Sequence, residues 1–512
     1  MRKLHEINKQ EYAISNSVFD SKNRMRIVGI GEMDGEITYP ANAPFNPPEN
    51  YPEYPFKEID TSNTVYPLVR ALLLEMGLDK EHFGTPTWNP LKQYIKRGAK
   101  VIIKPNWVFD ISQYDINALI THMSVIRPIL DYAFLACGKK GRIDILESPI
   151  ENTDWDRLHS ITKAPETVAF LKKKGVTITL QDIRTECFVE KDVFNILGWR
   201  LKFFYRKKRP GTKRGYVNID IGKKSALHDI GNKVHMMRGI QHWAAKDVQN
   251  AHSETRHLYK IPKEILEADC FINIPKLKTH RKAGVTLTLK NLVGMADKKV
   301  WLPHFIEGTP QDGGDESPSK RQWHVKLIDE LSIIHFFKKF GFSFRPPGVE
   351  KLWRKKIEED LLELRNVRQA NWHGGDTVWR MVYDLNMILF HADEKGKLHS
   401  KQQRNYFSII DGVISGEKFG PLDSVPKKTG VVIAGDDPVL VELIGTRLMG
   451  FDENKIKTIT NVSKAAYSFG SANLSDVIIT SNKEKWKQLL TTPKSVAFTF
   501  IPAPGWQGHI EL

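Results

Sequence analysis

The densest group of residues that can do chemistry lies between positions 273 and 304, in NIPKLKTHRKAGVTLTLKNLVGMADKKVWLPH. Lysine and histidine at this density can bind a carboxylate or phosphate, transfer protons or form a covalent link. The candidates are Lys276, Lys278, His280, Lys290, Asn291 and His304. We predict catalytic roles for His280 and Lys290 and metal binding by His304, while the other three are predicted to bind substrate. A basic surface loop is the alternative.

Four further candidates lie nearer the N-terminus. Lys104 and Asn106, in the sequence KPN, follow an apolar run and are predicted to bind an anionic group. A turn is the alternative, because proline biases the preceding residue toward an extended conformation and asparagine is common in turns. Glu147, in ILESP, is predicted to be a general base or metal ligand, with a plain loop carboxylate as the alternative. His122 precedes a predicted helix and is either a substrate-binding pocket residue or a helix cap.

The C-terminal part adds another set. In WHGGDTVWR (372–380), Asp376 can cap a helix while facing a pocket, and Arg380 can clamp a carboxylate or phosphate. Both are predicted to bind substrate, although capping alone explains Asp376 equally well. Asp411, in IIDG, is predicted to bind a divalent cation, with a strand-to-turn Asp-Gly as the alternative. His252 and His257 are five residues apart, so we interpret them as surface or capping residues.

These residues must be positioned by a sheet, because strand-like apolar runs alternate with helical patterns. Strands are expected at 24–31, 101–108, 141–149, 176–182, 270–274, 406–414 and 429–435, and helices at 63–76, 125–137, 165–175 and 438–450. Most candidates follow the carboxyl ends of strands, where ligands bind in open α/β sheets. We therefore predict an α/β fold with two lobes, built of mixed or parallel sheets that helices cover.

Four parts of the chain are expected. They are an N-terminal segment with a proline-rich loop (1–95), an α/β core lobe with the KPN and PKLKTH motifs (96–310), a basic helical insertion or linker (311–370) and a C-terminal α/β lobe (371–512). A flexible hinge is expected at 311–322. The helices of 320–370 carry apolar residues beside Lys and Arg, so they either pack on the main body or contact an anionic membrane or a partner subunit.

Composition excludes several classes of protein. The 512 residues are 41% hydrophobic and 27% charged, which is incompatible with a disordered or fibrous chain. No apolar run reaches the roughly 18 residues of a membrane span. GIGEMDG (29–35) is one residue too long for the dinucleotide fingerprint. The N-terminus has no apolar signal segment, so a cytoplasmic location is expected.

Charge and cysteine content restrict partners and cofactors. The net charge of +16 is dispersed and accompanies no nucleic-acid motif, so nucleic acid is disfavoured as a partner. The expected partner is a small anionic molecule, while a homo-oligomer, an anionic membrane surface and an acidic protein remain open. Cys137, Cys187 and Cys270 lack a C-x-x-C spacing, so we expect reduced, buried thiols and no iron–sulfur cluster in this chain.

The motifs also resemble those of a known family. KPN (104–106), PKLKTH (275–280), AGVTLTLKNLVG (283–294), IIDGVISGE (409–417), FGPL (419–422) and LMGFD (448–452) are similar to domain of unknown function family 362, an uncharacterised prokaryotic family. The resemblance covers roughly residues 95–455. NWHGGDTVWRMVYDLNMILFHAD (371–393) resembles a subgroup of that family.

A more distant resemblance implies chemistry. His280, Gly284, Thr286 and Lys290 form H-x-x-x-G-x-T-x-x-x-K, which is similar to the cofactor-anchoring segment of nickel-pincer lactate racemases. The resemblance implies a lactate-racemase-like fold, with Lys290 as anchor of a pincer nucleotide and His280 as a base. The racemase pattern has a metal-ligating histidine sixteen residues after the lysine, where this chain has Ile306, with His304 two residues earlier. A divalent metal or a nickel-pincer-like nucleotide is thus the cofactor to consider.

Together these patterns predict an enzyme acting on a small anionic substrate: a hydroxy acid, a sugar acid or a phosphorylated sugar. Lysine and histidine would transfer a proton in an epimerisation or isomerisation. The chain alternatively predicts a non-catalytic protein that assembles on a membrane surface or a partner. A third reading is a maturation factor that carries a metal or cofactor to another enzyme.

Overall fold

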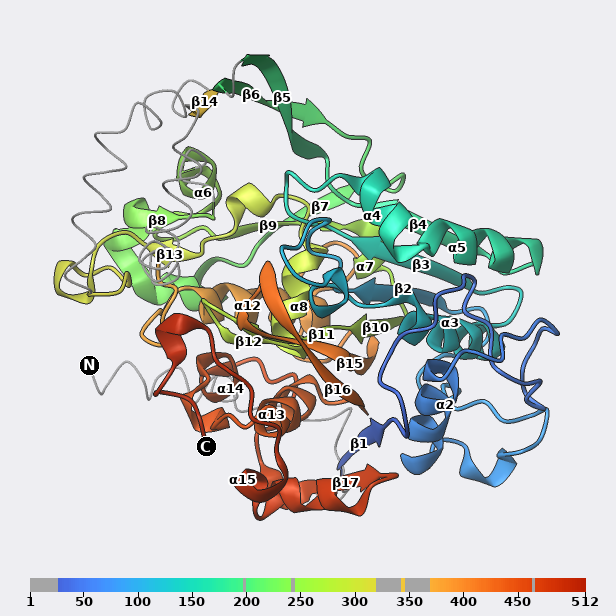
Figure 1. Cartoon of the computed structure of the whole chain (residues 1–512). Helices are drawn as coiled ribbons and strands as arrows, with labels where there is room; N and C mark the ends of the chain where they lie inside the picture. The colour runs from blue at the N-terminus through green and yellow to red at the C-terminus, as the bar shows by residue number, and fades with distance from the viewer. Residues whose placement is uncertain (1–25, 197–198, 241–244, 319–341, 346–368, 463–465) are drawn as a thin grey trace.

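The computed structural model describes residues 26–196, 199–240, 245–318, 342–345, 369–462 and 466–512. Its centre is a ten-stranded sheet whose main path runs β17-β1-β16-β15-β10-β2-β3-β4 (Figure 1). These strands are β1 (Arg26–Glu32), β2 (Lys100–Pro105), β3 (Arg142–Glu147), β4 (Ile178–Asp182), β10 (Cys270–Ile274), β15 (Asn405–Phe419), β16 (Asp423–Gly435) and β17 (Val477–Ser481). Two short strands, β11 (Lys276–His280) and β12 (Gly284–Thr286), extend the sheet beside β15.

The sheet is largely parallel. β15, β10, β2, β3 and β4 run parallel to one another, and β17 is parallel to β1. β16 runs antiparallel to both of its neighbours, β15 and β1. The predicted α/β class with mixed sheets is therefore confirmed, and the sheet combines strands from 96–310 with strands from 371–512.

Helices cover both faces of the sheet because its buried strands alternate their side chains between two hydrophobic cores. In β2, Val101 and Ile103 join one core, whereas Ile102 joins the other. The first core is covered by α2 (Val65–Glu75), α3 (Met123–Cys137), α4 (Trp155–Thr162) and α5 (Ala164–Lys173). The second is covered by α8 (Thr288–Asn291), α12 (Val378–His391) and α13 (Pro438–Leu448).

Smaller elements lie around this body. They are β5 (Glu186–Ile196), β6 (Trp199–Lys208) and β14 (Phe342–Arg345) in one sheet, β7 (Tyr216–Asp220) with β9 (Leu258–Pro262), β8 (Met237–Arg238) with β13 (Phe305–Ile306), and the helices α6 (Ala245–Ala251), α7 (Lys263–Leu266), α14 (Lys457–Thr460) and α15 (Pro493–Val496).

The described part of the hinge predicted at 311–322 is anchored to the body. Asp315 is buried and accepts hydrogen bonds from the backbone N–H groups of Ile306, Asp376 and Thr377. A buried carboxylate held by three backbone donors fixes the backbone on both sides of it, so the expectation of a flexible hinge is wrong at this position. Of the segment 320–370, where helices were expected, the structure describes only 342–345, which form the strand β14, and 369–370, which lie in a turn.

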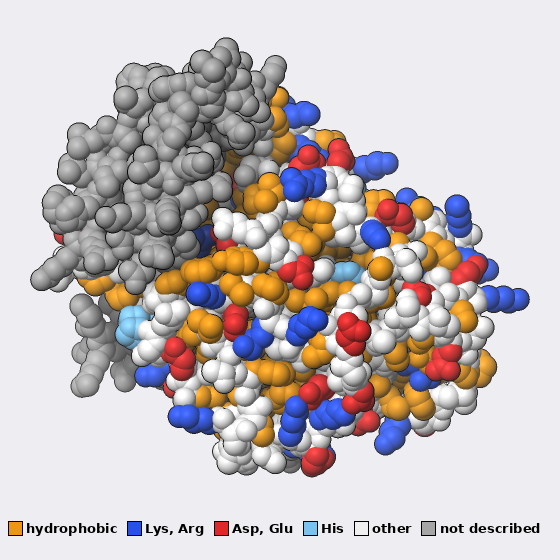
Figure 2. Space-filling view, in the orientation of Figure 1, with side chains coloured by type: hydrophobic (Ala, Val, Ile, Leu, Met, Phe, Trp, Pro, Cys, Tyr) orange, Lys and Arg blue, Asp and Glu red, His pale blue; other side chains and the backbone are white. Residues whose placement is uncertain are grey.

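The surface agrees with the dispersed charge of the sequence. On the face shown in Figure 2, Lys and Arg side chains are interspersed with Asp and Glu. No described helix is both long and apolar enough to cross a membrane. Cys137, Cys187 and Cys270 are free and buried, which confirms the expected buried thiols.

Candidate functional site

Three neighbouring parallel strands end at the same edge of the sheet, and the predicted residues follow them. β2 ends in Lys104 and Pro105, β3 ends in Glu147, and β10 leads into β11 with its lysines. Because β10 pairs with β2 and β2 pairs with β3, these ends are adjacent. The edge that sequence patterns indicate is therefore a real cluster of polar side chains.

Lys104 and Glu147 form a buried ion pair at this edge. The Lys104 Nζ lies 2.7 Å from Glu147 Oε2, and both side chains are at most 2% exposed. Glu147 also accepts the backbone N–H groups of Trp107 and Ser148. A side chain at Gly294 would collide with both charged groups, so glycine is needed for this close approach. The predicted anion binder and the predicted base thus neutralise each other.

A second buried ion pair joins Lys276 to Asp411 at 3.0 Å. The Tyr39 hydroxyl donates to Asp411 Oδ1 at 2.5 Å and accepts from Lys276 Nζ at 2.7 Å. Burial lowers the Lys276 pKa, and the Asp411 carboxylate opposes that shift. His122 donates its backbone N–H to Asp411, while its imidazole accepts the Ser124 N–H and caps α3. Of the two explanations for His122, the structure supports the cap.

Asn106 and Asn291 take part in a line of buried amides. Asn106 Nδ2 donates to Asn291 Oδ1 at 2.8 Å, and Asn291 Nδ2 donates to Asn273 Oδ1 at 2.7 Å. Asn273 in turn donates to the Tyr406 hydroxyl. Asn106 Oδ1 is buried and has no hydrogen-bond partner among the described residues. The line connects the end of β2 to α8, and so it fixes the helix that carries Lys290.

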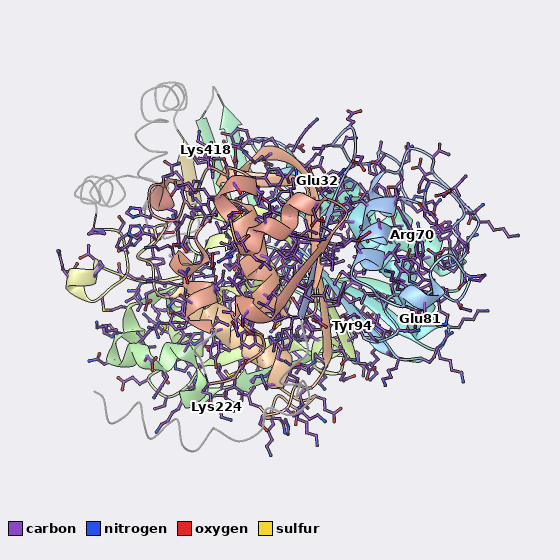
Figure 3. The ribbon with its side chains drawn as sticks, turned by 90° about the horizontal axis from the view of Figure 1, so that it is seen from below. Glu32, Arg70, Glu81, Tyr94, Lys224 and Lys418 are labelled. Atoms are coloured by element: carbon purple, nitrogen blue, oxygen red, sulfur yellow. The ribbon has the colours of Figure 1, made fainter. Side chains whose placement is uncertain are left out.

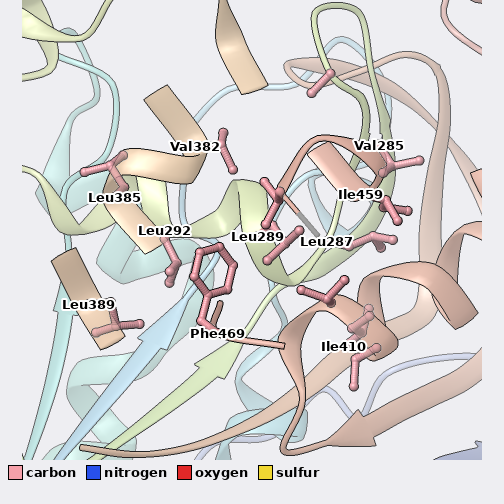
Figure 4. Packing of buried hydrophobic residues seen from close by; sticks show 14 of the residues in the cluster. Val285, Leu287, Leu289, Leu292, Val382, Leu385, Leu389, Ile410, Ile459 and Phe469 are labelled. Atoms are coloured by element: carbon pink, nitrogen blue, oxygen red, sulfur yellow. The ribbon is translucent and has the colours of Figure 1, made fainter. Parts of the chain in front are cut away.

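Lys290 lies on α8, a single turn that is held from two sides. Leu289 and Leu292 pack among Val382, Leu385 and Leu389 of α12 (Figure 4). The Glu442 carboxylate of α13 accepts the Thr288 hydroxyl and the Leu289 N–H, both at 2.9 Å. These contacts fix the backbone position from which the Lys290 side chain extends.

Lys290 is a buried residue whose amine has no hydrogen-bond partner among the described residues. The residue is 7% exposed, and burial lowers its pKa to about 8, against the opposing effect of Glu442. Burial likewise raises the pKa of Glu442 to about 7, and its Oε1 has no described partner. A neutral amine is therefore accessible near neutral pH, which an ordinary lysine does not offer.

His280 belongs to the same surroundings, and its tautomer is fixed by the turn between β11 and β12. The backbone N–H groups of Lys282 and Ala283 donate to His280 Nδ1 at 3.0 and 3.2 Å. Nδ1 is therefore an acceptor, and the neutral ring carries its proton on Nε2. Gly284 has φ +82° and closes this turn, a conformation that glycine adopts without strain. Burial, followed by Lys290, lowers the His280 pKa well below its ordinary value.

His304 has the opposite tautomer. Its Nδ1 donates to the Leu302 carbonyl at 2.8 Å, so Nε2 carries a lone pair. Its pKa is also lowered by burial and then by Lys290. Neither the Nε2 of His304 nor that of His280 has a described partner, and the residues are 3% and 5% exposed. The two imidazoles thus offer a proton acceptor and a proton donor near one amine.

Three more lysines surround Lys290. Lys278 donates to the carbonyls of Leu119 and Pro421, Lys282 donates to Gln369, and Lys299 donates to Val293. Burial lowers the pKa of Lys282 and of Lys299 to about 7, and that of Lys278 well below its ordinary value. Lys282 and Lys299 are not among the residues predicted from the sequence. We call Lys278, His280, Lys282, Lys290, Lys299 and His304 the Lys290 cluster.

Residues 212–447 match the family model described as domain of unknown function (DUF362). The chain carries a DUF362 domain. Its matched range is narrower than the 95–455 expected from the motifs. Neither a curated protein nor a solved structure shows significant similarity to the chain.

The DUF362 domain contains the complete Lys290 cluster, together with Asp411 and Glu442. β2 and β3, which supply Lys104, Asn106 and Glu147, come before it in the chain. The buried Lys104–Glu147 pair therefore belongs to strands outside the DUF362 domain, although the same sheet continues through both.

Asp376 and Arg380 of the DUF362 domain pair with each other. Arg380, in the first turn of α12, places Nη2 2.8 Å from Oδ2 of Asp376, which precedes the helix, and Arg380 Nη1 donates to the Ala226 carbonyl. Asp376 also accepts from Trp379 and Lys457. These hydrogen bonds engage both side chains within the protein.

The predicted metal ligands are not part of a ligand cluster in the described residues. His304 offers one lone pair, and Asp411 is paired with Lys276. Asp79, Glu81 and His82 do have ligand atoms within 4.8 Å of one another. Asp79, however, already accepts from His82, Lys92 and the Asn89 N–H. Glu81 lies on the right of the view in Figure 3, as does Arg70, and Lys224 and Lys418 lie on the left.

Of the two interpretations of His252 and His257, as surface or capping residues, the surface one is wrong. Both are buried, and their Nδ1 atoms lie 3.2 Å apart. His252 Nε2 donates to the Trp301 carbonyl, so its Nδ1 accepts from His257. The two residues flank a loop and pair across it, so a helical spacing rule did not apply to them.

Proposed function

We propose that this protein is an enzyme that transfers a proton on a small anionic substrate, as in an epimerisation or isomerisation. The substrate is a hydroxy acid, a sugar acid or a phosphorylated sugar. The observation that carries the proposal is the Lys290 cluster, in which an amine and two imidazoles of opposite tautomer are buried without described partners for their reactive nitrogens. Titratable groups whose pKa values are strongly perturbed cluster at functional sites.

The charge of the cluster favours an anionic substrate. Lys278, Lys282 and Lys299 donate hydrogen bonds to backbone carbonyls, and no carboxylate of the described residues contacts their amines. Buried charge without a counter-ion is costly, and an anionic ligand relieves that cost on binding. Charge binding is therefore assigned to these lysines rather than to Lys104 and Arg380, which have carboxylate partners.

The proton-transfer roles follow from the tautomers. His280 Nε2–H is a donor toward the substrate, and His304 Nε2 is an acceptor. Lys290, with a pKa of about 8, can act in either direction near neutral pH. We assign the base role to His304 rather than to Glu147, because the Glu147 carboxylate oxygens already accept two backbone N–H groups and the Lys104 amine.

The racemase resemblance implies a nickel-pincer nucleotide, and Lys290 and His304 are the residues that would hold it. Lys290 has a free amine, as an anchor requires, and His304 has a free lone pair, as a nickel ligand requires. When bound, the pincer nucleotide would supply a nickel ion beside the substrate. The roles assigned above to His280, Lys290 and His304 belong to the chain itself.

Proton exchange in deuterated water tests the proposal. Lactate, gluconate and glucose 6-phosphate are incubated with the protein, and loss of the carbon-bound proton signal is followed by NMR. We expect exchange on one of these classes, and a loss of roughly 1000-fold in His280→Gln and in Lys290→Arg. Lys223→Arg, a change of the same type at an exposed lysine, is the control and should keep full exchange. Full exchange in both cluster variants would overturn the assignment.

The alternative functions depend on other parts of the chain. Assembly on a membrane surface or a partner depends on the helices predicted at 320–370, of which the structure describes only 342–345 and 369–370. A maturation factor would need the same pocket as an enzyme. If the proton-exchange activity is retained after deletion of 320–368, the activity of the pocket does not depend on that segment.

A further inference from the structure

Lys290 differs from every other buried lysine of the described residues. The five are Lys104, Lys276, Lys278, Lys282 and Lys290. The first two form ion pairs with carboxylates, and the next two donate to backbone carbonyls. The Lys290 amine alone has no such partner. A lysine that is desolvated and placed among other cations is an activated nucleophile.

For the Lys290 amine to attack a carbonyl group, it needs a base and an acid as neighbours, and it has both. Forming a carbon–nitrogen bond at a carbonyl needs a base for the proton of the amine and an acid for the carbonyl oxygen. His304 Nε2 has the lone pair, and His280 Nε2 has the proton. The turn that fixes the His280 tautomer is itself held, because Arg281 donates its N–H to Gly420 and accepts from Trp506.

We propose that Lys290 forms an imine with a carbonyl substrate that carries a carboxylate or phosphate, with His304 as the base and His280 as the acid. This inference rests on the proposed function for its site and its anionic substrate, and it adds the covalent step and the carbonyl group. The substrate class is thereby a 2-oxo acid or the open-chain carbonyl form of a sugar phosphate.

The step balances within the cluster and solvent water. The neutral Lys290 amine attacks the carbonyl carbon, a carbon–nitrogen bond forms, and the carbonyl oxygen takes the proton from His280 Nε2. His304 Nε2 takes a proton from the new secondary ammonium, which leaves a carbinolamine. The carbon–oxygen bond then breaks, the hydroxyl receives the proton held by His304, and water leaves. The carbon–nitrogen double bond keeps its proton as an iminium, and His280 Nε2 regains a proton from solvent water, which restores both imidazoles. No oxidant or reductant is required.

The imine would also explain the proton transfer of the proposed function. The positively charged iminium acidifies the proton on the adjacent carbon, because the electrons that remain are delocalised toward nitrogen and give a neutral enamine. His304 Nε2, free again after water has left, is then available to remove that proton. Lys290 and His304 would thus act in sequence on one substrate.

Borohydride trapping tests the covalent step. The intact mass of the full-length protein is measured first, to establish that Lys290 is unmodified. Pyruvate and dihydroxyacetone phosphate are then added at about pH 7 with sodium borohydride, and the stable adduct is mapped by peptide mass spectrometry. Acetone, which has the carbonyl without the anion, is the matched probe.

We expect an adduct at Lys290 with an anionic probe. Its pKa of about 8, against about 10.4 for a surface lysine, gives roughly 100-fold more neutral amine at the same pH. Lys290→Arg should abolish this adduct, and His304→Gln should slow its formation at least about 10-fold while the melting temperature is retained. Acetone should label Lys290 no faster than it labels surface lysines.

Two results would overturn the proposal. Labelling of surface lysines without Lys290 would show that its amine is not a nucleophile, and an existing covalent adduct on Lys290 would show that it is an anchor. In both cases proton exchange by the wild-type protein tells whether the proposed function survives. Conversely, trapping at Lys290 without exchange on any substrate would retain the imine and remove the proton transfer.

Discussion

Two groups of buried charges lie at the same edge of the sheet and are built in opposite ways. In the Lys104–Glu147 and Lys276–Asp411 pairs, each ammonium contacts a carboxylate. In the Lys290 cluster, the lysines donate to backbone carbonyls or have no described hydrogen-bond partner, and the Nε2 atoms of the two imidazoles have no described partner either. Breaking a buried pair leaves an uncompensated charge, whereas removing an uncompensated charge relieves strain. The first group therefore stabilises the edge, and the second is available for ligand chemistry.

Breaking the first pair should have the largest effect on stability. Lys104→Met keeps most of the side-chain volume but leaves the Glu147 carboxylate buried without its ammonium. We expect the free energy of unfolding to fall by about 4 kcal/mol, as measured by urea denaturation. The double change Lys104→Met with Glu147→Gln should recover part of that loss. A single variant as stable as the wild type would mean that the pair does not stabilise the edge.

Glu442 sharpens the comparison through pH. Its pKa in the folded protein is raised from 4.5 to about 7, so its contribution to stability is full below pH 4.5 and is lost as the pH rises through 7. Glu442→Gln removes this dependence. Relative to the wild type, the variant should gain about 3 kcal/mol between about pH 4.5 and about pH 8. Denaturation curves at several pH values measure it, and parallel curves for the two proteins would contradict the buried acid.

Tyr39 tests how far the second ion pair depends on its hydroxyl. Tyr39→Phe removes a group that bridges Lys276 and Asp411 and accepts from the Ile414 N–H. We expect a loss of about 2 kcal/mol in the free energy of unfolding, because these partners are buried and lose a hydrogen bond. An unchanged free energy of unfolding would indicate that Lys276 and Asp411 stabilise each other without the Tyr39 hydroxyl.

The sequence predicted much of this edge but little of its pairing. Apolar runs and helical periodicity placed most of the main strands, and the carboxyl-end rule brought Lys104, Glu147 and Lys276 to one edge. It did not reveal that Lys104 contacts Glu147, since the two are 43 positions apart and meet only because β2 and β3 are neighbours. Nor did it select Glu442, which reads as an ordinary position of a buried helix. Tautomers depend on turn geometry, which residue spacing does not specify.

The Lys290 cluster makes the smallest and most discriminating prediction. Lys290→Met removes a buried ammonium that lacks a described partner and replaces it with a side chain of similar volume. The Lys290 pKa is lowered to about 8, so at neutral pH the folded protein bears the cost of a buried charge that the unfolded chain does not. That cost disappears as the pH rises toward 10.5, where the unfolded lysine also loses its proton. We therefore expect Lys290→Met to be about 1 kcal/mol more stable than the wild type at pH 7, with a smaller gain near pH 10, after the imperfect packing of methionine is subtracted.

Denaturation at the two pH values measures the gain. The opposite signs of Lys104→Met and Lys290→Met would separate a lysine kept for stability from one kept for chemistry, and a loss in both would place Lys290 with the structural pairs.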